Sequence, residues 1–166
     1  LLINRCLADT MPRIKRLAKT LGFDLATPRA VVVADISPLI QRSYTEYGQS
    51  ELVLDRSEKN IIQHLGRHHL TKSKDIAVIL DKKLIIFKEF QLPLCHELLQ
   101  QWCQQLCSAF DNRKKGPVFC GIGAVVKSIH EYQMSFAQAE FCLKYCSNSR
   151  PFTTVYDRDV SAKYLL

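Results

Sequence analysis

The amino-acid sequence predicts an α/β protein of the α+β kind, in which a mixed, hairpin-containing sheet is flanked by helices. Residues 30–34 form a continuous valine-rich run, which is typical of a strand buried on both faces. Residues 76–80 and 84–87 are apolar runs separated by only three residues, as in an antiparallel hairpin with a tight turn. Helical patterns of apolar spacing lie between the strands, so we expect crossover helices on the faces of the sheet.

The composition is that of one globular domain. The chain has 166 residues, of which 47% are hydrophobic and 23% are charged. A domain of this length buries roughly 70% of the surface that its unfolded chain exposes, which is enough for one core. No uncharged apolar run reaches the ~18 residues of a membrane-spanning helix, and no signal peptide is recognisable. We therefore expect a cytoplasmic protein without membrane contact.

Two helices are expected before the first strand. Residues 4–8 look like the end of a helix that enters from upstream, and the missing initial methionine suggests a piece of a longer protein. Thr10 can cap the second helix, Pro12 lies in its first turn, and Gly22 follows its end. Its apolar stripe consists of Ile14, Leu17, Ala18 and Leu21. Residues 23–28 then form a turn.

The first strand closes at Asp35, and the residues after it are harder to interpret. Residues 37–54 show no clear periodicity, so we assign them no regular element. Asp55 with Glu58, or Ser57 alone, can cap the next helix. The apolar stripe of this helix consists of Ile61, Ile62, Leu65 and Leu70.

The clearest amphipathic helix is predicted to open at Leu92-Pro93 and to end at Phe110, before a polar, basic loop at residues 111–116. Its apolar residues recur at steps of three and four, so this face packs against the sheet. They are Leu98, Leu99, Trp102, Cys103, Leu106, Cys107 and Phe110.

The last third of the chain contains a strand, a glycine turn and a capped helix. The apolar run 118–120 leads into Gly121 and Gly123, which we interpret as glycines of a strand end. Ser128 and Glu131 have the spacing of a capping box, in which each side chain bonds a backbone amide at the start of a helix. The apolar residues of this helix are Ile129, Phe136, Ala139 and Leu143.

The cysteines do not indicate a metal site or a disulfide framework. The chain has 7 cysteines and no C-x-x-C pair. Cys103 and Cys107, like Cys142 and Cys146, are four residues apart in helical patterns, where side chains share one face. Such pairs are small core hydrophobes, and reduced thiols agree with a cytoplasmic location. We expect no metal and no cofactor.

The best candidate site residues are Asp35, at the end of the first strand, and Asp81, at the hairpin tip. Two carboxylates at adjacent strand ends can hold Mg²⁺ against a nucleotide phosphate. Alternatively, such aspartates accept hydrogen bonds from backbone amides. We favour the alternative, because Lys82 and Lys83 would neutralise a metal site and the hairpin has no glycine that lets the backbone approach a phosphate.

Other catalytic patterns are incomplete. His64 and His68 are four residues apart, as in a zinc protease, but Leu65 stands where the glutamate base should follow the first histidine. Gly121-Ile122-Gly123 lacks the third glycine of a dinucleotide fingerprint, and no serine or cysteine lies in a nucleophile motif. We therefore assign no catalytic residue.

The net charge of +7 indicates contact with something acidic, and nucleic acid is the obvious candidate. The basic residues are scattered, however, and neither a helix-turn-helix nor an aromatic-rich RNA-binding strand is recognisable. They include Arg13, Lys15, Arg16, Lys19, Lys72, Lys74, Arg113, Lys114 and Lys115. We favour a solvated basic surface and keep a nucleic-acid-binding domain as the second alternative function.

Three segments resemble the middle domain of the carbohydrate-diacid regulators, bacterial transcription factors related to the purine-catabolism regulators. The segments are Leu17 to Leu25 with Pro28-Arg29 and the valine run, Gly121-Ile122-Gly123 with Ser135, Phe136 and Ala139, and Tyr156-Asp157 leading to Leu165-Leu166. Together they span nearly the whole chain.

The resemblance implies a fold similar to that of the GGDEF cyclases, placed between an amino-terminal ligand-sensing domain and a carboxy-terminal helix-turn-helix domain. In the cyclases the signature lies on the central hairpin, whereas residues 79–84 read Ile-Leu-Asp-Lys-Lys-Leu. Asp35 corresponds to a metal-binding aspartate of the cyclases, and Ser37 stands where a second acid is expected. The resemblance thus implies a degenerate, non-catalytic relative.

We therefore expect a regulatory domain that relays a ligand-induced state, forms a homo-oligomer and meets DNA only through a carboxy-terminal domain. The first alternative function is a nucleotide-binding or cyclase-like enzyme domain that uses the two aspartates. The expected boundaries are a helical connector at 1–22, a GGDEF-like domain at 23–156 that ends in a short strand at 153–156, and the start of a linker at 157–166.

Overall fold

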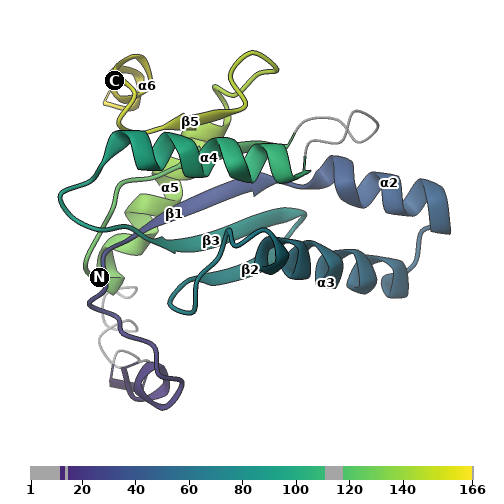
Figure 1. The fold of residues 1–166 in the computed structure, drawn as a ribbon, viewed down its shortest axis with the longest axis horizontal. Helices are drawn as coiled ribbons and strands as arrows, with labels where there is room; N and C mark the ends of the chain where they lie inside the picture. Colours follow the sequence, from purple (N-terminus) through teal and green to yellow (C-terminus); the bar gives the residue numbers. More distant parts are fainter. Residues whose placement is uncertain (1–11, 14, 111–117, 166) are drawn as a thin grey trace, which may run out of the picture.

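The computed structural model describes residues 12–13, 15–110 and 118–165. Within them, a five-stranded sheet has the strand order β2-β3-β1-β4-β5 (Figure 1). The strands are β1 (Arg29–Asp35), β2 (Ile76–Leu80), β3 (Lys83–Glu89), β4 (Phe119–Ile122) and β5 (Phe152–Thr154). The pairs β2–β3, β3–β1 and β1–β4 are antiparallel, and β4–β5 is parallel. The mixed sheet predicted from the sequence is confirmed.

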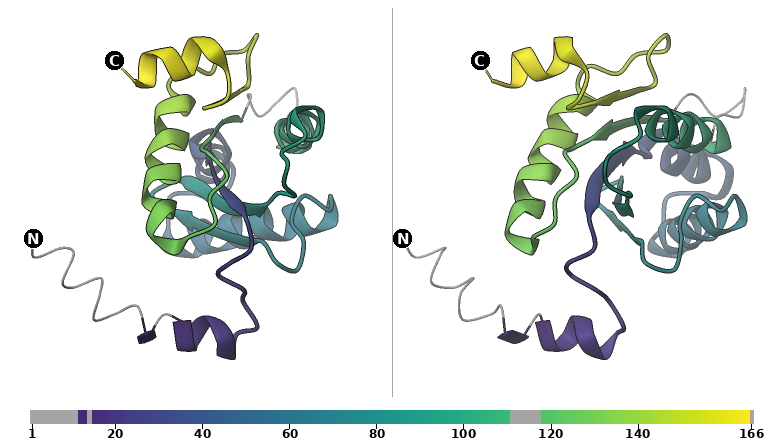
Figure 2. Two further views of the ribbon diagram at one scale, coloured as in Figure 1. Left: turned by 90° about the vertical axis from the view of Figure 1, so that its left-hand side faces the viewer. Right: turned by 60° about the vertical axis from the view of Figure 1, so that its left-hand side comes forward.

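Helices cover both faces of the sheet (Figure 2). One face carries α2 (Ser37–Tyr47), α3 (Glu51–Arg67) and α4 (His96–Phe110). The other carries α5 (Tyr132–Leu143), which follows the short 3-10 helix η1 (Ile129–Glu131). The predicted capping box of Ser128 and Glu131 is present and opens η1. After β5, α6 (Arg158–Tyr164) contacts α5.

The central strand β1 is buried on both faces, as its valine run predicts. Val32 and Ala34 are fully buried in the core that β1 shares with α2, α3 and α4. Val31 and Val33 are fully buried in the smaller core that it shares with α5. Because successive side chains of a strand point to opposite faces, β1 contributes to both cores at once.

Residues 37–54 are not irregular, since they contain α2 and the start of α3. The α2 helix has no side-chain cap, because its N-cap residue is Ile36, and of its residues only Leu39 and Ile40 are buried. Its sequence therefore lacks both a polar start signal and a full apolar stripe. The α3 helix begins at the Ser50 cap, whose Oγ accepts a hydrogen bond from the Val53 amide at 3.3 Å. The predicted caps at residues 55–58 are wrong.

The hairpin turn contains two residues and not three. Asp81 and Lys82 have φ values of 49° and 61°, and Lys83 already belongs to β3. Positive φ at both central positions is the mark of a type I′ turn, which matches the twist of the two strands. The sequence does not indicate this turn, because the type normally carries Asn-Gly or Asp-Gly.

The helix predicted from Leu92-Pro93 begins later, at His96 in α4. Its helical bonding starts where the Leu99 amide donates to the Cys95 carbonyl at 3.1 Å. The predicted apolar face is largely confirmed, since Leu99, Cys103, Leu106, Cys107 and Phe110 are buried. Leu98 is an exception, with an exposed fraction of 62%.

The amino-terminal helix ends at residue 20, and Gly22 follows with a φ of +68°. The Gly22 amide donates to the Lys19 carbonyl and the Phe23 amide to the Ala18 carbonyl, which is the hydrogen-bond pair of a Schellman cap. The predicted helix at residues 4–8, the Thr10 cap and Ile14 lie outside the described residues. Among residues 12–13, 15–110 and 118–165, no helix has the length and apolar character needed to cross a membrane.

Candidate functional site

The two candidate aspartates lie at the same end of the sheet. The β1–β3 register places Asp35 opposite Lys83, next to the turn that contains Asp81. Asp35 Oδ1 accepts a hydrogen bond from the Ser37 amide at 2.9 Å, at the start of α2. Asp81 is exposed at the first position of the turn. For Asp35, the interpretation as a backbone-amide acceptor therefore agrees with the structure.

The base of the hairpin is tied to α5 by an ion pair. Lys83 Nζ lies 2.5 Å from Glu140 Oε1, so the lysine beside the turn contacts a glutamate of α5. In the described part of the chain, no group of three or more His, Cys, Asp or Glu residues is arranged to hold a metal ion. The ion pair thus connects this end of the sheet to α5.

The histidine pair on α3 takes part in helix packing. The His64 ring lies 4.2 Å from the His68 ring and 5.0 Å from the Phe110 ring, between centroids. His64 Nε2 is 2.7 Å from the carbonyl oxygen of Ala109. These contacts join α3 to the end of α4.

Gly121 and Gly123 let α5 lie directly against β4. A Cβ atom added to Gly121 would lie 2.5 Å from the Leu143 nitrogen, and one added to Gly123 would lie 2.6 Å from Ser135 Oγ. Any side chain would therefore push the helix away from the sheet. Gly121 lies inside β4, whereas Gly123 directly follows its last residue, so the interpretation as a strand-end residue agrees with the structure for Gly123 and is corrected for Gly121. The requirement at both positions is close approach of a helix.

Buried hydrogen bonds fix the first half of α5 to the sheet. Ser135 Oγ accepts from the Val31 amide at 3.0 Å and donates to the Ala124 carbonyl at 2.8 Å. The Ala124 amide donates to Gln138 Oε1 at 2.9 Å. These polar side chains satisfy backbone groups that would otherwise be buried without partners, so α5 has one defined position.

At its carboxy-terminal end, α5 contacts β5 and α6. Thr153 Oγ1 of β5 donates a short hydrogen bond to the Cys142 carbonyl. The Phe141 ring of α5 lies 5.1 Å from the Tyr164 ring of α6, edge to face. The second half of α5 is thereby joined to the last strand and the last helix.

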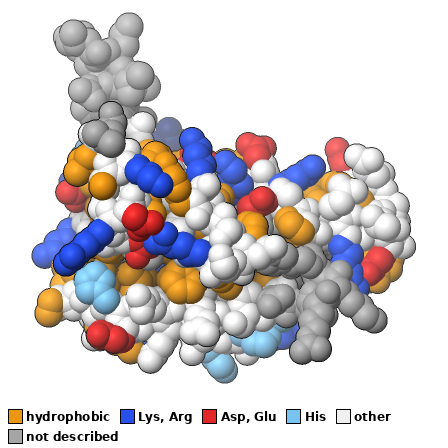
Figure 3. All heavy atoms as spheres, turned by 90° about the horizontal axis from the view of Figure 1, so that it is seen from above, with side chains coloured by type: hydrophobic (Ala, Val, Ile, Leu, Met, Phe, Trp, Pro, Cys, Tyr) orange, Lys and Arg blue, Asp and Glu red, His pale blue; other side chains and the backbone are white. Residues whose placement is uncertain are grey.

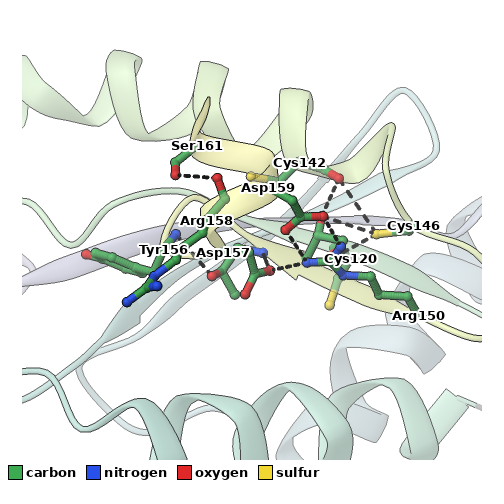
Figure 4. Close-up of polar contacts among 11 residues, drawn as sticks. Cys120, Cys142, Cys146, Arg150, Tyr156, Asp157, Arg158, Asp159 and Ser161 are labelled. Carbon is green, nitrogen blue, oxygen red and sulfur yellow. Dashed lines mark hydrogen bonds and ion pairs between the residues drawn. The ribbon is translucent and has the colours of Figure 1, made fainter. Parts of the chain in front are cut away.

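The carboxy-terminal junction, which we define as Arg150, Asp157 and Asp159, holds α6 in place (Figure 4). Arg150 Nη1 lies 2.6 Å from Asp159 Oδ2, and its Nη2 lies 3.0 Å from Asp157 Oδ2. The hydrogen bond from Arg150 lowers the pKa of the Asp159 carboxyl. The same face of the molecule shows basic, acidic and apolar side chains next to one another (Figure 3).

The thiols beneath this junction are packing groups, as the sequence predicts. Cys107 Sγ and Cys120 Sγ are 3.6 Å apart between α4 and β4, and Cys146 Sγ donates to the Cys120 carbonyl at 3.2 Å. Burial raises the pKa of Cys142 to about 12 and also raises the pKa of Cys103. Because the thiolate is the reactive form, burial lowers the reactivity of these two groups.

Sequence reasoning missed most of the residues that position α5. Ser135 and Ala139 are four apart and face Gly123 and Gly121 across the helix–strand contact. Small residues at this spacing, following a Gly-x-Gly segment, are the signal that could have predicted the close approach. Arg150 carried no such signal, because a single arginine in a polar segment resembles any solvated charge.

Comparison with known proteins identifies the family. The sequence profile described as "GGDEF-like domain" matches residues 7–145. This match covers most of the chain, and the chain therefore belongs to the GGDEF-like domain family. The five-stranded, mostly antiparallel sheet with helices on both faces agrees with that assignment. No curated protein matches the chain.

Two solved structures of one bacterial GGDEF domain are similar to the chain. The first is an amino-terminally shortened form of TpbB (YfiN) from Pseudomonas aeruginosa that contains only its GGDEF domain. It has 10% sequence identity and a TM-score of 0.46, and the match covers 96% of this chain and 94% of that chain. A second structure of the same domain has 10% identity and a TM-score of 0.42, covering 87% of this chain and 91% of that chain.

Proposed function

We propose that the chain is a non-catalytic signal-relay domain of a carbohydrate-diacid-type transcriptional regulator. It acts in the cytoplasm as a homo-oligomer, between an upstream ligand-sensing domain and a downstream helix-turn-helix domain that binds DNA. Membership of the GGDEF-like family and the resemblance of three sequence segments to these regulators support the proposal.

The observation that carries the proposal is the position of α5. The helix runs from beside the start of β1 to α6 in both views of Figure 2. Its first half is bonded to the start of β1 through Ser135 and Val31, and its second half contacts α6 through Phe141 and Tyr164. A displacement of the segment that precedes β1 therefore has a continuous packed route to the last helix.

The chemistry at the hairpin supports a non-catalytic role. The turn carries Asp81 and Lys82 at positive φ and has no glycine. Asp35 Oδ1 is engaged by the Ser37 amide, and Lys83 pairs with Glu140. A phosphate cradle requires backbone amides that a ligand can approach closely, and a metal site requires carboxylate oxygens directed at the ion.

Calorimetric titration of the chain with GTP and Mg²⁺ tests the non-catalytic role. We expect no heat of binding in the micromolar range and no cyclic product after long incubation. Micromolar binding that Asp35→Ala abolishes would show instead a nucleotide-binding domain. Glu131→Ala is a suitable control, because Glu131 serves the capping box at the other end of the sheet.

Filter binding to promoter DNA tests where DNA recognition resides. We expect only weak association with DNA. The affinity should fall steeply between about 50 and 200 mM salt, as it does for non-specific contacts with DNA phosphates. Sequence-specific binding by this chain at physiological salt would place recognition in this domain and would contradict the proposal.

A further inference from the structure

Arg29, the first residue of β1, is a charged side chain in an unusual place. Its exposed fraction is 0%. Its guanidinium lies over the Phe23 ring at 4.0 Å from the centroid, and its Nη1 donates to the Asp24 carbonyl at 2.7 Å. Its Nε donates to the Lys74 carbonyl, before β2, at 3.1 Å. The side chain therefore holds the amino-terminal turn, which we define as residues 23–27, against the sheet.

Arg29 belongs to none of the ion pairs formed among the described residues, although its cation is buried. The pKa of the Asp24 carboxyl is lowered mainly by the hydrogen bond from the Ala26 amide, with a smaller contribution from the charge of Arg29. Carbonyl oxygens and an aromatic face thus provide most of the compensation for the buried charge.

The compensation is incomplete even with the turn in place. Within the described residues, Arg29 Nη2 is buried and has no hydrogen-bond partner. Removing a buried cation's remaining partners leaves an uncompensated charge, which is strongly unfavourable. If the turn moved away with Phe23 and the Asp24 carbonyl, the guanidinium would lose its ring contact and its shortest hydrogen bond and would keep the Lys74 carbonyl and the Tyr132 hydroxyl as partners outside the turn. The position of the turn and the position of the guanidinium are therefore coupled.

The backbone of the same residue holds the segment that leads into α5. The Arg29 amide donates to the Val126 carbonyl at 2.9 Å, and the Val126 amide donates to the Arg29 carbonyl at 2.8 Å. Arg29 Nη1 also lies 3.4 Å from the hydroxyl of Tyr132, the first residue of α5. One residue thus contacts the amino-terminal turn and the start of α5 through its side chain, and the segment that leads into α5 through its backbone.

We infer that Arg29 is a latch that couples the position of the amino-terminal turn to the start of α5. When the turn is seated, the guanidinium is compensated and β1 holds Val126. When the turn is displaced, the guanidinium loses its partners in the turn, and the start of α5 loosens. The biological meaning of the latch rests on the proposed relay, whereas its existence can be measured in this chain alone.

A double-mutant cycle read by amide hydrogen exchange tests the latch. Phe23→Ala removes the ring from the guanidinium and should release the turn. We expect the exchange of the Val126 and Phe136 amides to become about tenfold faster, a size that reports local opening and not global unfolding. Arg29→Met removes the charge and keeps most of the volume, and in this background Phe23→Ala should change the same rates by less than about twofold.

Two results would overturn the latch. In the first, Phe23→Ala changes the exchange rates equally in the presence of Arg29 and in the Arg29→Met background. In the second, Phe23→Ala alone leaves the exchange of the Val126 and Phe136 amides unchanged. If Arg29→Met does not fold, Arg29→Lys serves in its place, because a point charge cannot bond the Asp24 and Lys74 carbonyls simultaneously as the guanidinium fork does. Arg67→Met, on the exposed side of α3, is the matched control and should leave the cycle unchanged. If the cycle shows coupling at Val126 and Phe136 but exchange in α6 does not change, the latch is supported and only the proposed relay is contradicted.

Discussion

Two arginines hold the two ends of this domain, and they do so in opposite ways. Arg29 is fully buried at the start of β1 and is compensated by carbonyl groups and the Phe23 ring. Arg150 has a side-chain exposure of 37% and pairs with two carboxylates at the carboxy-terminal junction. The first contact is coupled to the packing of the core, whereas the second is an ion-pair network at the surface.

The difference indicates how each end should respond to perturbation. The Arg29 guanidinium is shielded from water while the amino-terminal turn covers it, so its contacts with Phe23 and with the Asp24 carbonyl are expected to form and break together. An exposed ion pair exchanges protein partners for water at little cost and weakens with salt. The contact of Arg29 is therefore expected to respond to perturbation as one unit. The contact of Arg150 is expected to weaken gradually, so that the attachment of α6 depends on salt.

The largest effect is expected for Arg29→Ala. The substitution removes the guanidinium from the Asp24 and Lys74 carbonyls and leaves a cavity, so we expect a loss of about 3 to 5 kcal/mol in unfolding free energy. Urea titration followed by circular dichroism measures it. A loss similar to that of Arg150→Ala would remove the contrast between the two arginines.

The second-largest effect is expected for Gly123→Ala, at the contact between β4 and α5, the helix that joins the two ends of the domain. Gly123→Ala places a Cβ against the Ser135 backbone and side chain, so α5 must shift away from β4. We expect a loss of about 2 kcal/mol, as for other overpacked contacts, together with chemical-shift changes at both ends of α5. Gly66→Ala is the matched control, because a Cβ at this helical position meets nothing within 4 Å. Changes confined to the β4 side would argue against α5 as a rigid connection.

Arg150→Ala should have a smaller effect that depends on salt. Surface ion pairs contribute up to about 1 kcal/mol, and two of them share this arginine. We expect a lowering of the melting temperature that is largest at low ionic strength and shrinks by about half or more near 1 M NaCl, where charges are screened within ~3 Å. Calorimetry at the two salt concentrations measures the change, and a loss that is equal in both would mean that Arg150 acts by packing.

The smallest effect concerns pH at the same junction. The pKa of Asp159 is lowered in the folded state by the hydrogen bond from Arg150, so its contribution is present above the unfolded value of about 3.9. It is lost as the pH falls through the lowered folded pKa. Wild type should therefore be more stable than Asp159→Asn at pH 6, and the difference should shrink as the pH falls below the unfolded value and through the lowered folded pKa. The same pH dependence in an Arg150→Ala background would contradict this cause.

The sheet and most helices could be predicted from the sequence because apolar periodicity and capping residues identify those elements. The valine run identified β1, and Ser128 with Glu131 identified the start of η1. The α2 helix was missed because Ile36 is an apolar N-cap and the helix buries only two residues. The type I′ turn was missed because Asp81 and Lys82 adopt positive φ without a glycine. These misses concern elements whose conformation depends on tertiary contacts.

The candidate site was less predictable than the fold. Asp35 and Asp81 were correctly placed at one end of the sheet, but sequence cannot show that Asp35 Oδ1 bonds the Ser37 amide. The sequence analysis assigned no role to the Arg29 side chain, since nothing in a linear sequence reports that Phe23 and the Asp24 carbonyl fold back over it. Long-range burial decides the roles of these residues.

Amide hydrogen exchange in α6 tests the relay along α5 most directly. The Phe23→Ala variant perturbs the amino-terminal turn, and the Ser161 and Leu165 amides, which bond the Asp157 and Ser161 carbonyls, report on α6. Leu17→Ala, an exposed position on the preceding helix, is the control. The account predicts severalfold faster exchange at both reporter amides in Phe23→Ala and wild-type rates in Leu17→Ala. Wild-type exchange in α6 while the turn itself is open would contradict it.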